Sequence, residues 1–339
     1  MSESAISGGS NGGPAADLSF RSLGSDIRVL IDPADDPAFP APEVAAQDVK
    51  EFIERFDRTL SRFREDSELT AFNADPRPTV PGSGLLRTLV RAGIWAARRT
   101  DGLVDPTLQG EILEAGYRES RAGAKGLSAG EVLEDAGPRA PASASAARRY
   151  ETIEVDDEAG TISRPPGVSI DPGGIGKGLA ADMAAGLLEG YPRFLVSCGG
   201  DIRVGGERTT EEPFEVFVEN PVSGRKPHFF RLGSGGIATS GTTARSWRNP
   251  DGKVAHHLLD PSSGRPSRTG LISCTALAPT ALEAEVLAKQ AVLSGPDGAG
   301  AILEDRGGIL VHEDGTVTVA GESRIRLRPP SPDPTSGEE

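Results

Sequence analysis

The chain has 339 residues, and its 50 acidic and 36 basic side chains give a net charge of −14. That length allows one large domain or two modest ones. The acidic surplus argues against a general nucleic-acid binder, whose affinity comes from neutralising phosphates. No stretch is long and apolar enough to predict a membrane span. Cys198 and Cys274 have neither disulfide-like nor metal-like spacing, so buried free thiols are expected.

The two ends of the chain have the composition of disordered tails. Residues 1–16 are small, polar and glycine-rich, and residues 328–339 are rich in proline and polar residues. The first segment has neither a basic n-region nor an apolar h-region, which favours a cytoplasmic location. Residues 17–327 are predicted to form a single domain.

The first third of this domain contains two predicted helices. Residues 18–31 alternate like a strand, and residues 32–42 hold four prolines and read as a loop. A helix is predicted over 42–63 and another over 85–99, with a turn region at 67–73 between them. The first helix would bury one face, made of Val49, Phe52, Ile53, Phe56, Leu60 and Phe63.

The rest of the chain is rich in strand patterns. Residues 118–149 look like a surface excursion with one weak helix at 129–135, and residues 150–164 read as a hairpin. A helix follows the glycine-rich run at 170–178, and another is predicted over 280–293. Strands are predicted over 194–198, 202–204, 214–219, 229–232, 236–240, 271–278, 309–311 and 317–319. The fold class is therefore α+β, with mostly antiparallel sheets and a few long helices.

The run from Ile170 to Gly178 is the most informative local pattern. It holds four glycines, Asp171 and Lys177, and an apolar helical pattern follows at once. Glycines let backbone amides approach a ligand, and a helix N-terminus favours an anion, so a phosphate is the natural ligand. Gly178 stands where a P-loop needs Ser or Thr, and Leu179 breaks the dinucleotide fingerprint. Taken alone, the run is equally consistent with a plain glycine turn.

Five polar clusters, each at a turn beside an apolar run, resemble in order and spacing the motifs of the ApbE family, the FAD:protein FMN transferases. The resemblance covers roughly residues 20–319. Asp101–Thr107 is similar to the family's Asp-Gly-Ala-Phe-Asp-Pro-Thr, and Asp171–Gly178 to its Asp-Leu-Gly-Gly-Ile-Ala-Lys-Gly. The other matching segments are Ser22–Ser25, Leu60–Leu69, Gly199–Asp201, Thr239–Gly241 and His257–Pro261.

The resemblance implies an ApbE-like fold and a flavin chemistry. Such proteins bind FAD and a divalent metal, usually Mg²⁺. They transfer FMN to a Thr or Ser hydroxyl of a target protein through a phosphoester bond and release AMP. By this resemblance, the FAD site contains Leu23, Phe63, Leu103, Val104, Asp105, Asp171, Gly173, Lys177, Ser240 and Leu258. A transferase is the preferred interpretation, and an FAD pyrophosphatase or a non-catalytic FAD-binding protein remains open.

The resemblance assigns catalytic roles to His257 and Asp260. A neutral imidazole can accept the proton of an attacking hydroxyl. His256 and His257 are adjacent, so on a strand they point to opposite faces and at most one can enter a pocket. Asp260, which precedes a proline, can equally be only an Asx-turn residue.

The metal site departs from the family's pattern. Where the family has Ala-Asp-Ala-Leu-Ala-Thr, this chain has Ala284-Glu285-Val286-Leu287-Ala288-Lys289. Glu285 with a carbonyl near Gly174 can still be expected to hold Mg²⁺, which is the preferred interpretation. Lys289 has no acceptor and cannot ligate a metal. Its ammonium can instead replace part of the metal's charge, or Glu285 and Lys289 can simply pair at i,i+4.

Overall fold

The computed structural model describes residues 6–8, 14–134, 137–226, 228–249, 251–321 and 325–327. The predicted C-terminal tail lies outside these residues, as does most of the N-terminal one. Within the latter, Ile6–Gly8 forms a short strand, β1, which pairs with a strand near the middle of the chain. None of the described helices combines the length and the apolar character needed to cross a bilayer.

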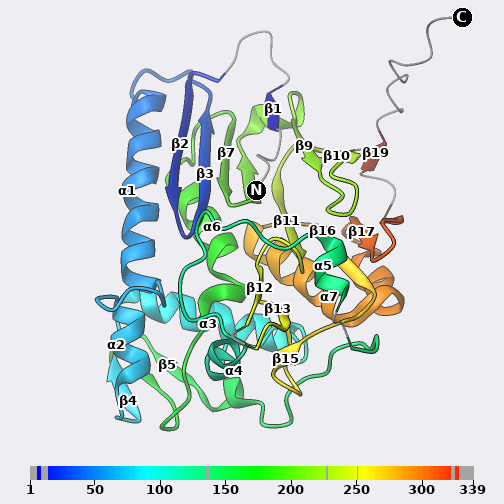
Figure 1. The fold of residues 1–339 in the computed structure, drawn as a ribbon. Helices are drawn as coiled ribbons and strands as arrows, with labels where there is room; N and C mark the ends of the chain where they lie inside the picture. The colour runs from blue at the N-terminus through cyan, green and yellow to red at the C-terminus, as the bar shows by residue number, and fades with distance from the viewer. Residues whose placement is uncertain are drawn as a thin grey trace, which may run out of the picture.

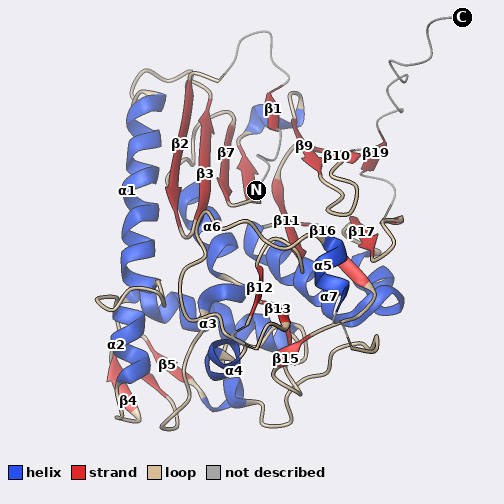
Figure 2. Ribbon diagram, viewed as in Figure 1, coloured by secondary structure: helices blue, strands red, loops and turns tan. Residues whose placement is uncertain are grey.

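An antiparallel sheet of eight strands forms the centre of the molecule (Figures 1 and 2). Every neighbouring pair in it is antiparallel, as the sequence predicts. From one edge to the other, the strands are β18 (Val317–Ala320), β17 (Gly308–His312), β16 (Leu271–Ala278), β11 (Gly235–Gly241), β8 (Asp201–Gly205), β7 (Phe194–Cys198), β3 (Ser25–Ile31) and β2 (Ala16–Ser22).

Among the described residues, four smaller sheets accompany the central one. A four-stranded sheet has the order β1, β9 (Phe214–Val218), β10 (His228–Leu232) and β19 (Ile325–Leu327). A three-stranded sheet joins β4 (Thr79–Pro81), β6 (Thr161–Ser163) and β5 (Glu154–Asp156). Two further pairs are β12 (Ser246–Arg248) with β13 (Val254–His256), and β14 (Leu259–Asp260) with β15 (Arg265–Pro266).

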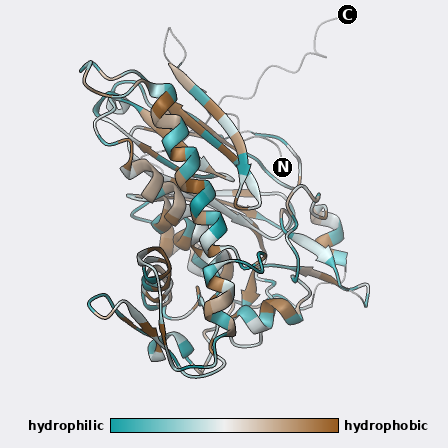
Figure 3. Ribbon diagram, turned by 90° about the vertical axis from the view of Figure 1, so that its left-hand side faces the viewer, coloured by the Kyte–Doolittle hydropathy of each residue, from teal (hydrophilic) through white to brown (hydrophobic). Residues whose placement is uncertain are grey.

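Three helices pack against the central sheet. Helix α1 lies on β2 and β3, α6 lies on β7 and β8, and α7 lies on β11 and β16. Figure 3 looks onto α1, where hydrophilic and hydrophobic residues alternate as expected of a helix with one buried face. The helices are α1 (Pro42–Leu60), α2 (Glu68–Ala74), α3 (Gly84–Arg99), α4 (Gln109–Glu114), α5 (Ala129–Glu134), α6 (Gly176–Gly186) and α7 (Ala281–Leu303).

The central sheet is buried on both faces by a strict alternation of side chains. Val29 and Ile31 belong to the core that contains α1, α3 and α6, whereas Leu30 belongs to the core formed with β9 and β10. In β7, Val196 and Leu195 divide in the same way. Because successive side chains of a strand point to opposite faces, the sheet lies between a helical layer and the four-stranded sheet.

Several predicted elements differ from those observed. Residues 18–31 form two strands, β2 and β3, because the chain turns at Leu23 and Gly24. The first helix ends at Leu60 because Ser61 is extended, so Phe63 lies in the following loop. The predicted turn at 67–73 is mostly helix α2, capped by Ser67, whose hydroxyl accepts from the amide of Thr70 at 3.0 Å. The last helix continues beyond Leu293 to Leu303, across a break at Gly295 (φ 74°) that precedes Pro296.

Candidate active site

A cavity of about 450 Å³ opens where the turn after β2, the loop after α1 and the first turn of α6 meet. This volume lies in the range of small-molecule and cofactor sites. Most of the residues predicted from the sequence line it, namely Leu23, Phe63, Leu103, Val104, Asp105, Asp171, Gly173, Gly174, Lys177, His257 and Leu258.

Three predicted site residues are not among the lining residues. The carboxylate of Asp260 accepts bonds from the amides of Ser143 and Ser262 at 3.0 and 3.1 Å, which is the turn role the sequence left open. Ser240 is buried in β11, opposite Cys274 of β16. Glu285 is buried at the start of α7, behind the cavity-lining lysines described below.

Leu23 enters the cavity from a tight turn. Ser22 pairs with Ser25, so Leu23 and Gly24 form a two-residue hairpin loop, with φ of 54° and 64°. Positive φ at both loop positions is the pattern of a type I′ turn, which normally selects Asn or Gly. Leucine is strained there, and the strained side chain contributes to the cavity wall.

Asp171 organises the glycine loop from within. One of its oxygens accepts the amide of Gly173 at 2.6 Å, and the other lies 3.2 Å from the guanidinium of Arg62. The carboxylate therefore caps the short 3₁₀ turn at 172–174 that leads into α6. Gly176 and Lys177 form the first turn of α6 and line the cavity, where amides of a helix N-terminus favour an anion.

Helix α7 approaches this loop closely because of Gly178. A Cβ on Gly178 would lie 2.6 Å from the carbonyl oxygen of Ala281, so a larger residue would separate the two helices. The amide of Gly178 donates to Oε2 of Glu285 at 2.9 Å. Asp182 of α6 in turn accepts the first amides of α7, from Ala281 and Leu282, at 2.8 and 2.9 Å. These contacts fix Glu285 behind the loop.

Two lysines and two carboxylates form a buried cluster beside the loop. Lys177 pairs closely with Asp201, and its ammonium lies 3.8 Å from Glu285. Burial alone would lower the pKa of Lys177, but the two carboxylates outweigh it and raise that pKa. Burial raises the pKa of Asp201, and the Lys177 charge partly offsets this effect. Lys177 is therefore held as a cation at the cavity wall.

The predicted metal ligands meet around the second lysine. Lys289 Nζ donates to the carbonyl oxygen of Gly174 at 3.1 Å and lies 3.5 Å from Oε1 of Glu285. No group of three or more His, Cys, Asp and Glu side chains placed to hold a metal occurs among the described residues. The residues present do not fit the six-oxygen shell that Mg²⁺ prefers, because an ammonium contacts both expected ligands.

His257 presents one ring nitrogen as a base. Its Nδ1 lies 3.3 Å from the backbone oxygen of Arg245. A carbonyl can only accept, so this contact is a hydrogen bond only when Nδ1 carries the proton and Nε2 carries the lone pair. Burial, together with the positive charges of Arg245 and Lys289, holds the pKa of His257 well below its ordinary value. The ring is therefore neutral.

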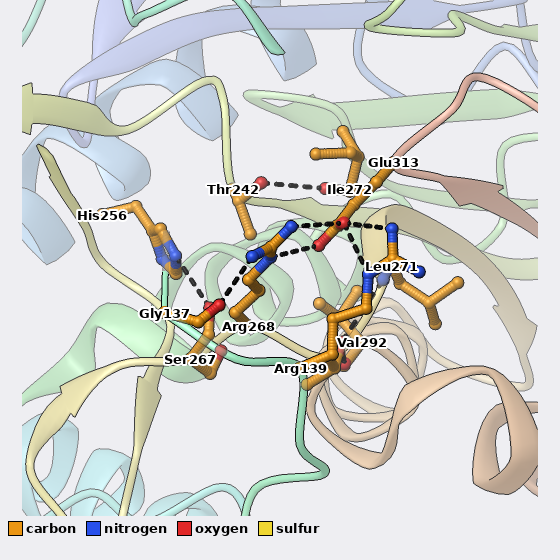
Figure 4. Close-up of polar contacts among 11 residues, drawn as sticks. Gly137, Arg139, Thr242, His256, Ser267, Arg268, Leu271, Ile272, Val292 and Glu313 are labelled. Atoms are coloured by element: carbon orange, nitrogen blue, oxygen red, sulfur yellow. Dashed lines mark hydrogen bonds and ion pairs between the residues drawn. The ribbon is translucent and has the colours of Figure 1, made fainter. Parts of the chain in front are cut away.

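His256 has a different environment. Its Nε2 donates to the carbonyl oxygen of Ser267 at 3.0 Å, and its Nδ1 accepts the amide of Leu258 at 3.3 Å. Figure 4 shows the His256–Ser267 contact beside the cluster around Arg268. Burial lowers the pKa of His256 to about 4. His257 lines the cavity and His256 is not among its lining residues, as expected for adjacent residues at a strand end.

One end of the cavity is aromatic. The rings of Phe63 and Tyr117 lie 5.3 Å apart, and Trp247 continues the series at 5.0 Å from Tyr117. The guanidinium of Arg62 lies over Phe63 and Tyr117, at 4.1 and 4.5 Å from their centroids. Arg62 thus links this aromatic group to Asp171 and the glycine loop.

The predicted surface excursion at 118–149 is attached to the rest of the protein at several points. Arg268 donates to the carbonyl oxygen of Gly137 at 2.6 Å, and Glu313 pairs with Arg139 at 2.7 Å and with Arg268 at 3.0 Å (Figure 4). At its beginning, Ser120 and Ala122 line the cavity. The segment therefore belongs to the cavity wall as well as to the surface.

Sequence reasoning gave no role to several lining residues. Among them are Asp57, Arg62, Tyr117 and Arg245. Arg62 lies inside the matching segment Leu60–Leu69, but nothing in that segment distinguished its guanidinium from those of its neighbours. Asp201, behind Lys177, belongs to a noted motif, but its partner could be found only in the folded structure.

Several known proteins are similar to this chain. It is 28% identical over 314 residues to the FAD:protein FMN transferase of Klebsiella pneumoniae (strain 342), covering 90% of this chain and 86% of that protein. It is 30% identical over 237 residues to the enzyme of the same name from Salmonella typhimurium, covering 68% of this chain and 65% of that enzyme.

Solved structures and a family comparison agree with these relatives. The crystal structure of the ApbE protein from Thermotoga maritima superposes with a TM-score of 0.72 at 28% identity, covering 90% of this chain and 96% of that one. The structure of apo flavinyl transferase ApbE from Pseudomonas stutzeri superposes with a TM-score of 0.70 at 26% identity, covering 90% of this chain and 94% of that one. Residues 23–311 match the ApbE family, and the chain therefore belongs to that family.

Proposed function

We propose that this protein is an FAD:protein FMN transferase, which moves FMN from FAD to a Thr or Ser hydroxyl of an acceptor protein. The observation that carries the proposal is the composition of one cavity. Aromatic and apolar side chains, two ammonium groups and a neutral imidazole all line it. The relatives named above support this reading. The acceptor protein and a cytoplasmic location remain predictions.

The two kinds of lining suit the two parts of FAD. Phe63, Tyr117 and Leu103 offer aromatic and apolar surface, which suits a flavin ring system. Lys177 and Lys289 offer positive charge beside the loop at 172–176, which suits a diphosphate. We place the diphosphate near Gly173 and Lys177, within reach of His257.

The reaction needs one proton acceptor and one stabilised leaving group. The acceptor hydroxyl oxygen attacks the phosphorus on the flavin side of the diphosphate, and its proton passes to Nε2 of His257. The bond from that phosphorus to the bridging oxygen breaks, and the oxygen leaves as part of AMP. The ammonium groups oppose the negative charge that builds up on the phosphoryl oxygens. Asp260 is assigned no proton transfer, because its carboxylate is engaged in the turn.

Product analysis tests this function. Purified protein is incubated with FAD, with and without a flavoprotein domain that carries an acceptor threonine, and the AMP and free FMN are quantified chromatographically. A transferase releases AMP with the acceptor present and leaves little free FMN. Equal amounts of AMP and free FMN, independent of the acceptor, would show a pyrophosphatase instead. Absence of AMP in both reactions would contradict any FAD cleavage.

A further inference from the structure

Lys289 occupies the space between the two groups expected to ligate a metal. Its ammonium contacts the carbonyl oxygen of Gly174 at 3.1 Å and Oε1 of Glu285 at 3.5 Å. Oε2 of Glu285 is already bonded to the amide of Gly178. Both oxygens of Glu285 are therefore engaged by donors of this chain.

A divalent cation at this position would meet a positive charge instead of oxygen ligands. Mg²⁺ binds about six oxygens at about 2.1 Å, and water or phosphate usually supplies several of them. The two protein oxygens expected here already contact the ammonium of Lys289. The Lys289 side chain is 10% exposed, so its charge is poorly screened by water. A metal could enter only if this ammonium left its two contacts.

The ammonium also stands where a metal's charge would be useful. Lys289 lines the cavity together with Lys177 and Gly174, and its ammonium donates to the carbonyl oxygen of Gly174. Glu285 contacts both ammonium groups, and Asp201 holds Lys177 from the side. The cluster thus holds two lysines at the wall before any ligand arrives, and positive charge that is positioned in advance stabilises developing negative charge. Burial lowers the pKa of Lys289, and the carboxylate of Glu285 opposes this effect.

We propose that Lys289 takes the place of the divalent metal, so that the protein binds and cleaves the FAD diphosphate without Mg²⁺. The proposal rests on the function proposed above. Lys289 neutralises charge on the diphosphate, and Glu285 orients Lys289 without ligating a metal. The covalent step and its proton transfer to His257 are unchanged, and no additional reactant is required.

Metal binding and metal dependence test this proposal separately. Mn²⁺ is titrated into the protein with FAD, and free Mn²⁺ is followed by electron paramagnetic resonance against the same FAD in buffer. The wild type should bind no Mn²⁺ beyond that held by FAD, whereas Lys289→Thr should bind about one per chain. Bound Mn²⁺ in the wild type would overturn the proposal, whether or not any transfer activity is found.

The transfer rate is then measured in EDTA and in Mg²⁺. The wild-type rates should agree within about twofold, and Lys289→Met should lose roughly 10²-fold or more in both conditions. In EDTA, Lys289→Thr should transfer as slowly as Lys289→Met, and its rate should recover when Mg²⁺ is added. A wild type that works only with Mg²⁺ would contradict the inference. No transfer or hydrolysis in any condition would contradict the proposed function, and the Mn²⁺ titration would still decide the metal question.

Discussion

The Nδ1 atom of His257 lies 3.3 Å from the backbone carbonyl oxygen of Arg245, and this contact determines which nitrogen can act as a base. The Nδ1 proton is directed at that carbonyl, so the free lone pair is on Nε2. The same backbone segment carries the Arg245 guanidinium, which lines the cavity and contacts Ser25 and Tyr117. The base and a neighbouring positive charge are therefore positioned by one element.

Replacement of His257 by alanine should abolish most turnover and leave FAD affinity nearly unchanged. Loss of a general base typically costs roughly 10²–10⁴ in rate. His256→Gln is the matched control, because His256 bonds Ser267 and Leu258 and glutamine can keep both contacts. Steady-state turnover and FAD titration of both variants provide the check. If His257→Ala kept wild-type turnover and His256→Gln were inactive, the base would be His256 and not His257.

Replacement of Lys177 by alanine should weaken FAD binding and spare riboflavin, which has no phosphate. A charge-assisted contact contributes roughly 1.5–3 kcal/mol, equivalent to about 10- to 150-fold in affinity. The buried carboxylates of Asp201 and Glu285 would also lose a counter-ion, which adds repulsion toward a diphosphate. Flavin fluorescence titrations measure both ligands, and the exposed Lys125→Ala serves as a charge control. Equal weakening of FAD and riboflavin would exclude a phosphate contact.

Acid should destabilise the protein partly through His256. Burial lowers its folded-state pKa from 6.5 to about 4, so the unfolded chain takes up a proton first. The stabilisation is complete above pH 6.5 and is lost as pH falls toward 4, by roughly 3 kcal/mol in total. Urea unfolding across this range should show a shallower loss in His256→Gln. Parallel pH curves for the two proteins would refute this assignment.

The turn at Leu23 should reverse the usual order of alanine and glycine. In ordinary backbone, Gly is less stable than Ala by roughly 0.5–1 kcal/mol. At φ 54°, Leu23→Gly should instead be more stable than Leu23→Ala by about 1 kcal/mol, because only glycine escapes the left-handed penalty. Both variants remove the side chain from the cavity and should weaken FAD alike. Chemical denaturation measures the free energy of unfolding of both variants. A higher stability of Leu23→Ala than of Leu23→Gly would argue against this turn geometry.

The elements with strong periodicity could be predicted from the sequence alone. The apolar stripe of α1 and the strand β16 lie close to their predicted positions. Helix α2 was missed because its seven residues are too few for a periodic signal. The second part of α7 was missed because Gly295 and Pro296 normally end a helix. The order of the strands could not be predicted, because it depends on pairings such as β3 with β7, which join residues far apart in the chain.

The site was predictable where one local motif carries the chemistry. The glycine loop with Lys177, and His257 as the histidine of the site, were predicted from motifs that resemble those of the family, and both line the cavity. Asp260 shows the limit, because a carboxylate in a motif can serve a turn and remain outside the cavity. The Lys177–Asp201 and Lys289–Gly174 contacts join separate elements. No spacing within a single segment reveals such pairs.

The mass of an acceptor protein tests the central claim most directly. A flavoprotein domain with one acceptor threonine, and its Thr→Val variant, are incubated with FAD and this protein and examined by intact-mass spectrometry. The account predicts that the threonine form alone gains the mass of one covalently attached FMN. It also predicts that His257→Ala transfers FMN more slowly by at least roughly 10²-fold. An acceptor of unchanged mass, beside FAD that has been converted to free FMN and AMP, would contradict it.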